Sequence, residues 1–547
     1  MKPLSSASRE IVEQLYRTGS LLNRLLAGNE YKKEAIRQIV KASEPAAIPF
    51  LLPVISGGDH ELRRLAASGL SELSAALTSS ELVQLDLEIR ESSPYGFTSP
   101  GSQPGWYDLK PHELSKLKGL PGYSTVMGFV SSHPSGYVRE AAVQELADIH
   151  DGSELPFLLI RLNDWVVNVR DAANVALKHR LRPFYATAFA SNLDLVQRLL
   201  DWKRADHASF VQSVFKLLQD TDGGKIIIDG LKSTNRSVKR ISYRLAWGLA
   251  ATDVKELLTQ ALNDNDLVIA RLAMRGIRSR LNKNELAECL PMALASHFMA
   301  VRREALDIYC QAIPEEAHRR LQSALLDRHS SIRQFVRYSL AQKESMDFAG
   351  FYRRAIKDPK QPGTLFAALG GLGETGTQAD GSAIEPFVTH ALSSIRKMAL
   401  RSLAKLCVEK HVDLFTRMLG DSSPGVSRIA KNALLSRIVL VQPDKVWDVL
   451  LSAEADYIRR HALAVLAGLR KWDSLGFILR AAGLTKDSLA SEVRRHLEWW
   501  VQNYNRSFSQ PTKAQLQEIH ESMSVAKQWL SDRHATAIAS ILASMPS

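Results

Sequence analysis

Residues 395–403 read IRKMALRSL, and this pattern decides the fold because it returns along most of the chain. An aliphatic residue is followed by a basic one, a small or apolar residue stands four positions after the aliphatic, and another apolar residue stands eight positions after it. With the aliphatic residue as position zero, the clear copies begin at Leu62, Val138, Val169, Val238, Ile269, Val301, Ile332, Ile395, Val426, Ile458 and Val493. Most neighbouring copies lie 31 to 35 residues apart, which predicts a stack of helical repeats.

Each copy has the composition of one helix that packs closely against its neighbours. Positions zero, four and eight, such as Val138, Ala142 and Leu146, fall on one side of a helix. Apolar segments at helical spacing precede the copies and predict a first helix in each repeat, at 155–162, 257–262, 321–326, 412–419 and 446–451. Two doubled gaps hide degenerate copies at 205–218 and 364–372, which gives about thirteen repeats.

Charged residues accompany the apolar pattern. Position one is basic in nine of the eleven clear copies. An aspartate stands five residues before position zero in four copies, at Asp164, Asp264, Asp327 and Asp421. An aspartate in this place is able to cap the second helix or end the turn before it.

The aspartate, the Val-Arg step and the small apolar face resemble the HEAT-repeat family, in particular its short bacterial form with about 31 residues per repeat. The resemblance covers roughly residues 45–500. It implies an all-α, right-handed solenoid of stacked antiparallel helix pairs, with the second helices on the concave face. It also implies a scaffold or adaptor whose concave face binds an extended partner, a protein in a larger bacterial assembly. A further implication is a structural pairing of the position-one arginines with the repeat aspartates.

The chain is expected to have three parts. Residues 1–44 and 501–547 predict helical caps, because the end repeats of a solenoid would otherwise expose their stacking faces. Residues 45–500 form the repeat array, with an insertion rich in Gly, Pro and Ser at 91–108. Four aromatic residues of the insertion either contact a partner or fold back onto the edge of the array: Tyr95, Phe97, Trp106 and Tyr107.

Composition limits the class of protein. Seventy Lys and Arg residues against 58 Asp and Glu give a net charge of +12, which suits an anionic partner. The three cysteines belong to no metal or redox motif and predict packed thiols in a reducing compartment. We find no signal peptide and no transmembrane stretch, so we expect a cytoplasmic protein without a membrane partner.

Position two predicts the partner-binding surface. It lies about 200° around the helix from position zero and is often basic, as is position six in three copies. These residues predict a basic stripe for a protein partner or for nucleic-acid phosphates, the alternative being a solvated surface: Arg240, Arg244, Arg271, Arg275, Arg303, Lys397, Arg401, Arg428, Arg460 and Arg495.

No catalytic motif is evident. The sequence has no zinc-protease, phosphate-loop, dinucleotide or nucleophile-elbow pattern. The glycine run 370–373 lies within a predicted second helix and indicates tight packing, and His461 and His496 at position three have no further metal ligands. An enzyme similar to the HEAT-like DNA glycosylases or bilin lyases is the least favoured alternative, because these families share only the repeat with this chain. We therefore expect no cofactor, no metal and no enzymatic activity.

Overall fold

The computed structural model describes residues 3–16, 29–91, 106–249, 253–359, 361–484, 489–506 and 508–543. Within these ranges the chain forms α-helices, short 3₁₀ helices and turns, and no β-strand. The chain divides into two compact units, Met1–Met292 and Ala293–Ser547, called unit 1 and unit 2 below.

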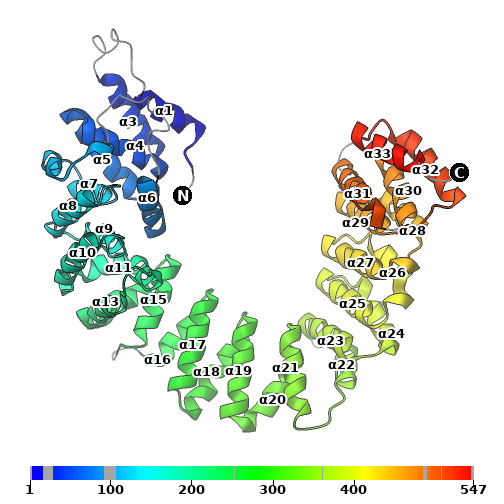
Figure 1. The fold of residues 1–547 in the computed structure, drawn as a ribbon. Helices are drawn as coiled ribbons and strands as arrows, with labels where there is room; N and C mark the ends of the chain where they lie inside the picture. Colours follow the sequence, from blue (N-terminus) through cyan, green and yellow to red (C-terminus); the bar gives the residue numbers. More distant parts are fainter. Residues whose placement is uncertain are drawn as a thin grey trace. The chain divides into compact units, whose positions relative to one another are not determined.

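Unit 1 consists of consecutive helices (Figure 1). They are α1 (Ser6–Tyr16), α3 (Glu30–Ala42), α4 (Ile48–Gly57), α5 (His60–Ser74), α6 (Ser79–Glu91), α7 (Tyr123–Val130), α8 (Gly136–Ala147), α9 (Leu155–Arg161), α10 (Val167–His179), α11 (Ala186–Ser191), α12 (Leu193–Arg198), α13 (Ala208–Asp220), α14 (Lys225–Gly230), α15 (Arg236–Ala246), α16 (Val254–Leu262), α17 (Leu267–Arg280) and α18 (Lys283–Ala295), the last of which spans the division between the units.

Unit 2 continues the same alternation of helices. They are α19 (Met299–Ala312), α20 (Pro314–Ala324), α21 (Ser330–Ala341), α22 (Phe348–Lys357), α23 (Pro362–Thr375), α24 (Gly381–Ile384), α25 (Ser393–Leu406), α26 (Val412–Met418), α27 (Pro424–Ser436), α28 (Pro443–Ser452), α29 (Asp456–Leu466), α30 (Lys471–Ala482), α31 (Ala490–Asn503), α32 (Lys513–Ala526) and α33 (Asp532–Ala543).

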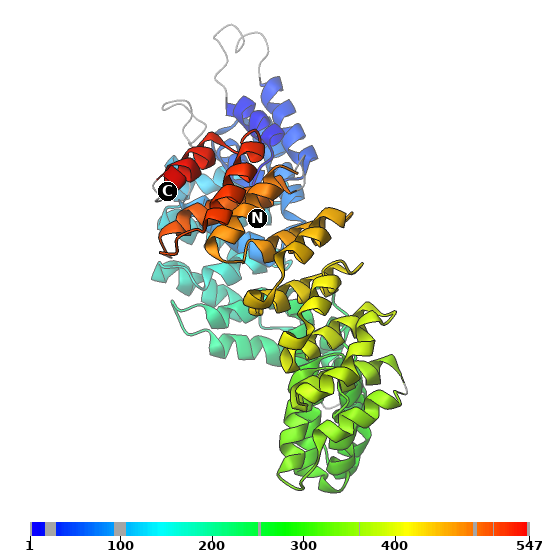
Figure 2. The same cartoon turned by 90° about the vertical axis from the view of Figure 1, so that its right-hand side faces the viewer.

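The helices of each unit are stacked as antiparallel pairs. In unit 2, α25, α27 and α29 form one layer and α26 and α28 form the other, and each second helix packs on its own first helix and on the next second helix (Figures 1 and 2). The predicted all-α solenoid of stacked helix pairs is confirmed in both units. The helices predicted in the two doubled gaps are present as α13 and α23.

The core runs along the seam between the layers and consists of the residues that the repeat pattern predicts. Position zero is buried in ten of its eleven copies, as at Val301 and Val426, and Val238 is half-buried. Position four is buried as Ala142 in α8 and Ala399 in α25. Burying one aliphatic side chain contributes about 1.5–3 kcal/mol, so the repeated seam supplies most of the stabilisation.

The glycine run of α23 marks close helix packing, as predicted. A Cβ atom built on Gly371 would lie 2.2 Å from Cε1 of Tyr352, and one built on Gly373 would lie 2.4 Å from Oγ of Ser402. Tyr352 lies in α22, and its hydroxyl donates to the carbonyl oxygen of Leu325 at 3.1 Å. The missing side chains therefore let α22 and α25 approach α23.

Part of the insertion lies within the described residues. Its central residues, including Tyr95 and Phe97, fall outside them. Trp106 opens a 3₁₀ helix, Trp106–Asp108, and its side chain is only 2% exposed. Trp106 lies against the His133 ring, with the two ring centroids 4.8 Å apart. The expectation that the aromatic residues fold back is confirmed for Trp106, and Tyr107 is half-buried.

The remaining expectations concern the termini and the membrane. The predicted caps at 1–44 and 501–547 contain α1, α3, α32 and α33, and their role as caps stays a prediction. Across the described ranges, no helix combines the length and the apolar character needed to span a bilayer.

Candidate functional site

Three position-one arginines bind the aspartate that lies 25 residues further along, at the turn of the next repeat. Arg139 donates from Nε and Nη2 to Asp164 at 2.9 and 2.8 Å. Arg302 binds Asp327 in the same two-pronged way, as Arg396 binds Asp421. Lys239 pairs with Asp264 as the lysine counterpart. The pairing that the HEAT resemblance implies is confirmed for these four basic residues. We call the four pairs of a basic residue and its aspartate the ladder, and each pair a rung.

The ladder also fixes the turn inside each repeat. Nη1 of Arg139 donates to the carbonyl oxygens of His133 and Pro134 at 2.9 and 2.8 Å, in the turn just before its own helix. Asp164 accepts the backbone N–H of Val166 at 3.0 Å. Each arginine rung therefore joins the turn of one repeat to the turn of the next.

Three other position-one residues make only some of the contacts that a ladder arginine makes. Arg333 pairs with Glu374 of α23 and not with Asp358, the aspartate that lies 25 residues further along. Arg170 and Arg459 donate to turn carbonyls, Arg170 to Asp164 at 2.7 Å and Arg459 to Ala453 at 2.8 Å. In α27, position one is Ser427, so the ladder has no arginine there.

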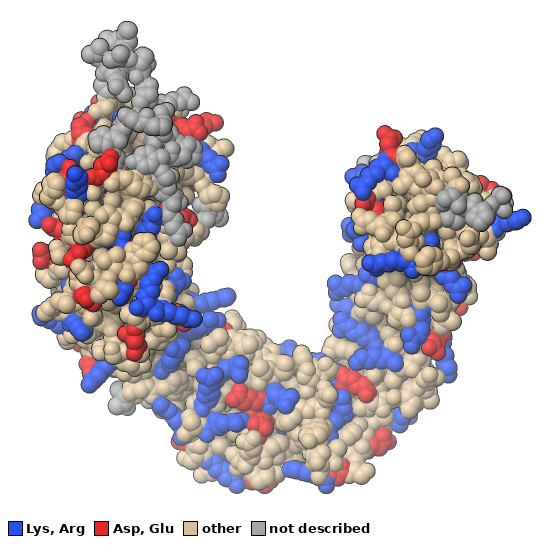
Figure 3. Space-filling view, viewed as in Figure 1, with Lys and Arg blue, Asp and Glu red and all other residues tan. Residues whose placement is uncertain are grey.

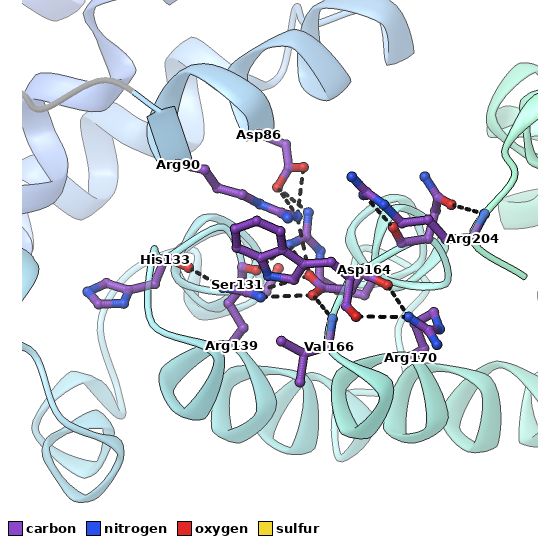
Figure 4. Close-up of polar contacts among 12 residues, drawn as sticks. Asp86, Arg90, Ser131, His133, Arg139, Asp164, Val166, Arg170 and Arg204 are labelled. Atoms are coloured by element: carbon purple, nitrogen blue, oxygen red, sulfur yellow. Dashed lines mark hydrogen bonds and ion pairs between the residues drawn. The ribbon is translucent and has the colours of Figure 1, made fainter.

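One rung in unit 1 is enlarged into a buried cluster of five charges (Figure 4). Arg90 in α6 binds Asp86 at 2.9 Å and Asp164 at 3.3 Å. Arg161 in α9 pairs with both aspartates, and Arg139 completes the group. Three guanidinium groups thus face two carboxylates beside the insertion.

The electrostatics of the cluster follow from its burial. Burial lowers the pKa of Arg161 to about 10, with the charge of Asp86 acting against it, so Arg161 stays charged at neutral pH. Burial alone would raise the pKa of Asp164. The hydrogen bonds from Arg139 and the charges of Arg161 and Arg90 outweigh burial, and the pKa of Asp164 lies below its usual range. The sequence pattern could not predict this cluster, because α6 lies outside the clear repeats.

Four residues of the predicted basic stripe are engaged within the chain. Arg240 binds Asp266 at 2.9 and 3.1 Å, and Arg244 donates to the side-chain oxygen of Gln197 at 2.9 Å. Arg303 stacks on the ring of Phe335, 4.1 Å from its centroid. Arg495 pairs with Glu492 one turn earlier. These contacts occupy all four side chains, and the carboxylates of Asp266 and Glu492 also offset the charges of Arg240 and Arg495.

The other six residues are available at the surface. They are Arg271, Arg275, Lys397, Arg401, Arg428 and Arg460. We find no hydrogen bond or ion pair between these six side chains and any other residue that the structure describes. Arg271 and Arg275 lie one turn apart on α17 in unit 1.

The remaining four lie in unit 2, on α25, α27 and α29, and Lys431 of α27 joins them. Figure 3 shows blue side chains gathered along the left edge of unit 2, over these three helices. We call Lys397, Arg401, Arg428, Lys431 and Arg460 the cationic row. It is the candidate functional site of the protein.

His461 lies next to residues of the cationic row, and their charges affect the pKa of its imidazole. The Ser427 hydroxyl donates to the carbonyl oxygen of Leu419 at 2.6 Å, so its oxygen accepts a hydrogen bond from Nδ1 of His461 at 2.8 Å. Burial lowers the pKa of His461, and the charges of Lys431, Arg460 and Arg428 lower it further. The imidazole is therefore neutral at physiological pH, and the field around it is positive.

Unit 1 contains a cavity of about 230 Å³ between α10 and α13. Two bases and two acids line it, Arg170 and Lys178 against Asp171 and Asp206. The charges of these four side chains balance, so the cavity favours neither anionic nor cationic ligands. No group of three or more His, Cys, Asp or Glu side chains suited to a metal ion occurs among the residues that the structure describes.

The comparisons with known proteins assign no family to this chain. No protein-family model and no curated protein matches it. Importin beta in an ammonium sulfate condition is 11% identical, with 98% of this chain and 74% of that chain covered and a TM-score of 0.29.

Two other solved structures give similar values. The S. pombe condensin Cnd3–Cnd2 subcomplex is 14% identical over 98% of this chain and 81% of that chain, with a TM-score of 0.32. A chain of the structure in which Kap95p binds RanGDP is 13% identical over 99% of this chain, which spans only 66% of it, with a TM-score of 0.29. Scores this low carry no argument about this protein. The class that its own fold defines is the α-solenoid, and membership of the short HEAT family stays a prediction.

Proposed function

We propose that this protein is a non-catalytic scaffold that binds an extended, negatively charged segment of a protein partner through the cationic row. The supporting observation is that five cations lie on three consecutive second helices. Neighbouring helices in such a stack are about 8–10 Å apart. A partner segment that crosses them would meet a cation at each helix, which favours an extended binding mode.

The ladder supports this proposal by keeping the row in register. Arg396 of α25 binds Asp421, which lies in the turn before α27. Tyr457 of α29 donates to the carbonyl oxygen of the same Asp421 at 2.9 Å. The three helices that carry the row are thus tied to one turn. A binding surface held in this way loses little conformational entropy when a partner binds.

Charge reversal tests the proposal. We expect Arg428→Glu to weaken the capture of protein partners from a lysate and to leave the melting temperature unchanged, because Arg428 is exposed. Arg417→Glu is the matched control, since Arg417 is also exposed but lies on α26, in the other layer. Equal partner capture by both variants would contradict the proposal.

Nucleic acid is the second candidate partner. The net charge of +12 and the available pair Arg271 and Arg275 on α17 favour it. This candidate predicts that DNA or RNA is retained during purification and that affinity falls steeply with salt. Binding partners that persist after nuclease treatment favour the scaffold, and their loss favours nucleic acid.

A further inference from the structure

The available cations of the predicted basic stripe in unit 2 form a local cluster. Arg303 on α19 stacks on Phe335, and Arg495 on α31 is paired with Glu492. The residues available between them are those of the cationic row on α25, α27 and α29. To bind a long polyanion along the solenoid, the protein would need unpaired cations on every second helix. The observed pattern fits a short, highly charged group.

The side chain of Lys397 connects α25 with the beginning of α27. A Cβ atom built on Gly425, at the start of α27, would lie 3.1 Å from Cδ and 3.6 Å from Nζ of Lys397. Lys397 of α25 therefore reaches over to α27. Arg428 lies one turn beyond Gly425, and Lys431 follows one turn later on the same helix.

The bond between His461 and Ser427 brings the third helix into the cluster. Ser427 precedes Arg428, and His461 follows Arg460, so this bond places the two arginines on neighbouring segments of α27 and α29. All the charged groups that shift the pKa of His461 are cations, namely Lys431, Arg460 and Arg428. Asp421, at the adjoining turn, is already bound by two nitrogens of Arg396. The charge of the cluster is thus left for a ligand.

We propose that the cationic row binds the phosphate group of a phosphorylated serine or threonine in the protein partner. This inference rests on the proposed scaffold function and names the chemistry of the segment that is bound. A phosphate carries a charge of about −1.5 to −2 and three strong acceptor oxygens, whereas a carboxylate carries one charge and two oxygens. Arginine forks match these oxygens in paired hydrogen bonds. Several neighbouring cations are therefore better neutralised by a phosphate than by a glutamate.

Binding of short probes to the full-length protein tests the proposal. The probes are a degenerate peptide library with one fixed phosphoserine, the same library with glutamate in that place, and a single-stranded oligonucleotide. We expect the phosphoserine library to bind at least about tenfold more tightly than the glutamate library. The variant Arg428→Ser/Arg460→Ser should lose this preference, while Arg417→Ser should keep it.

The outcomes separate the two proposals. Equal affinity for the phosphoserine and glutamate libraries, lost in the double variant, would overturn the phosphate site and leave the scaffold proposal standing. Tighter binding of the oligonucleotide, also lost in the double variant, would overturn both in favour of nucleic acid. No binding of any probe to the native protein would overturn both as well.

His461 supplies a readout that a change of stability would not move. A phosphate bound among Arg428, Lys431 and Arg460 offsets their field, so NMR titration should show the pKa of His461 rise when the phosphoserine library is added. The rise should be absent in Arg428→Ser/Arg460→Ser and present in Arg417→Ser. An unchanged pKa of His461 in the saturated native protein would overturn the assignment of the phosphate to this cluster.

Discussion

At the scale of single residues, the ladder relies on charges that are buried only because they are paired. The side chains of Arg139 and Asp164 are both 0% exposed. Taking such charges out of water is costly, and their hydrogen bonds offset this cost only when every partner is present. A ladder residue is therefore harder to replace than the surface arginines of the same repeats.

Arg139→Ala tests the buried rung. Removing the guanidinium leaves Asp164 with fewer partners and two turn carbonyls without a donor, so we expect the free energy of unfolding to fall by about 3–5 kcal/mol. Urea denaturation measures this change. Arg240→Ala is the control, because Arg240 binds Asp266 with the same geometry but is 39% exposed, and we expect a loss of about 1 kcal/mol or less. Equal losses in the two variants would contradict this account of the ladder.

The ladder also predicts acid sensitivity. Burial alone would raise the pKa of Asp327, but the hydrogen bonds from Arg302 outweigh it and the pKa lies below its usual range. Below a pH of about 4 the unfolded chain binds more protons than the folded one, so stability is lost as pH falls through the folded pKa. We expect Asp327→Asn to be less stable at pH 7 and to show a flatter fall of melting temperature between about pH 5 and 2. A parallel fall in both proteins would contradict the role of Asp327.

At the scale of helices, the glycines of α23 have no side chains, and this allows α22 and α25 to lie close to it. We expect Gly371→Ala to destabilise the protein by about 1–3 kcal/mol, because its methyl group would overlap the ring of buried Tyr352. Gly363→Ala in the same helix is the control. No atom lies within 4 Å of a Cβ atom built there, so we expect no loss and up to about 1 kcal/mol of gain. Thermal melts of both variants show whether helix packing or the helix propensity of the residue determines the stability of α23.

The sequence predicts helices well where the repeat is regular. Position zero and the ladder aspartates follow from periodicity, because a period of one repeat places equivalent residues at equivalent turns. The contribution of Arg90 in α6 to the rung of Asp164 could not be predicted, since it depends on a helix outside the pattern. Position two cannot by itself show which cations are engaged. Arg240 meets Asp266 and Arg303 meets Phe335 through side chains of the following repeat.

At the scale of the whole molecule, the contacts described here join neighbouring repeats within one unit. Stability in such an array is approximately a sum of local contributions. We expect Arg139→Ala to speed hydrogen exchange in α8–α10 and to leave exchange in α25–α29 unchanged. Peptide-resolved mass spectrometry measures both regions. Faster exchange throughout the chain would show that the protein unfolds as one cooperative body.

The direction of the ladder has a consequence for how this chain could lengthen. Each rung takes its arginine from one repeat and its aspartate from the following one, as Arg302 does with Asp327. A tandem duplication of residues 302–332 would copy the donor Arg302 at the beginning of the segment and the acceptor Asp327 near its end. The new copy would find a complementary neighbour on both sides without any compensating substitution. Gene duplication could thus extend the array at these segments, whereas the rung of α6, α8 and α9 would not be copied by a single-segment event.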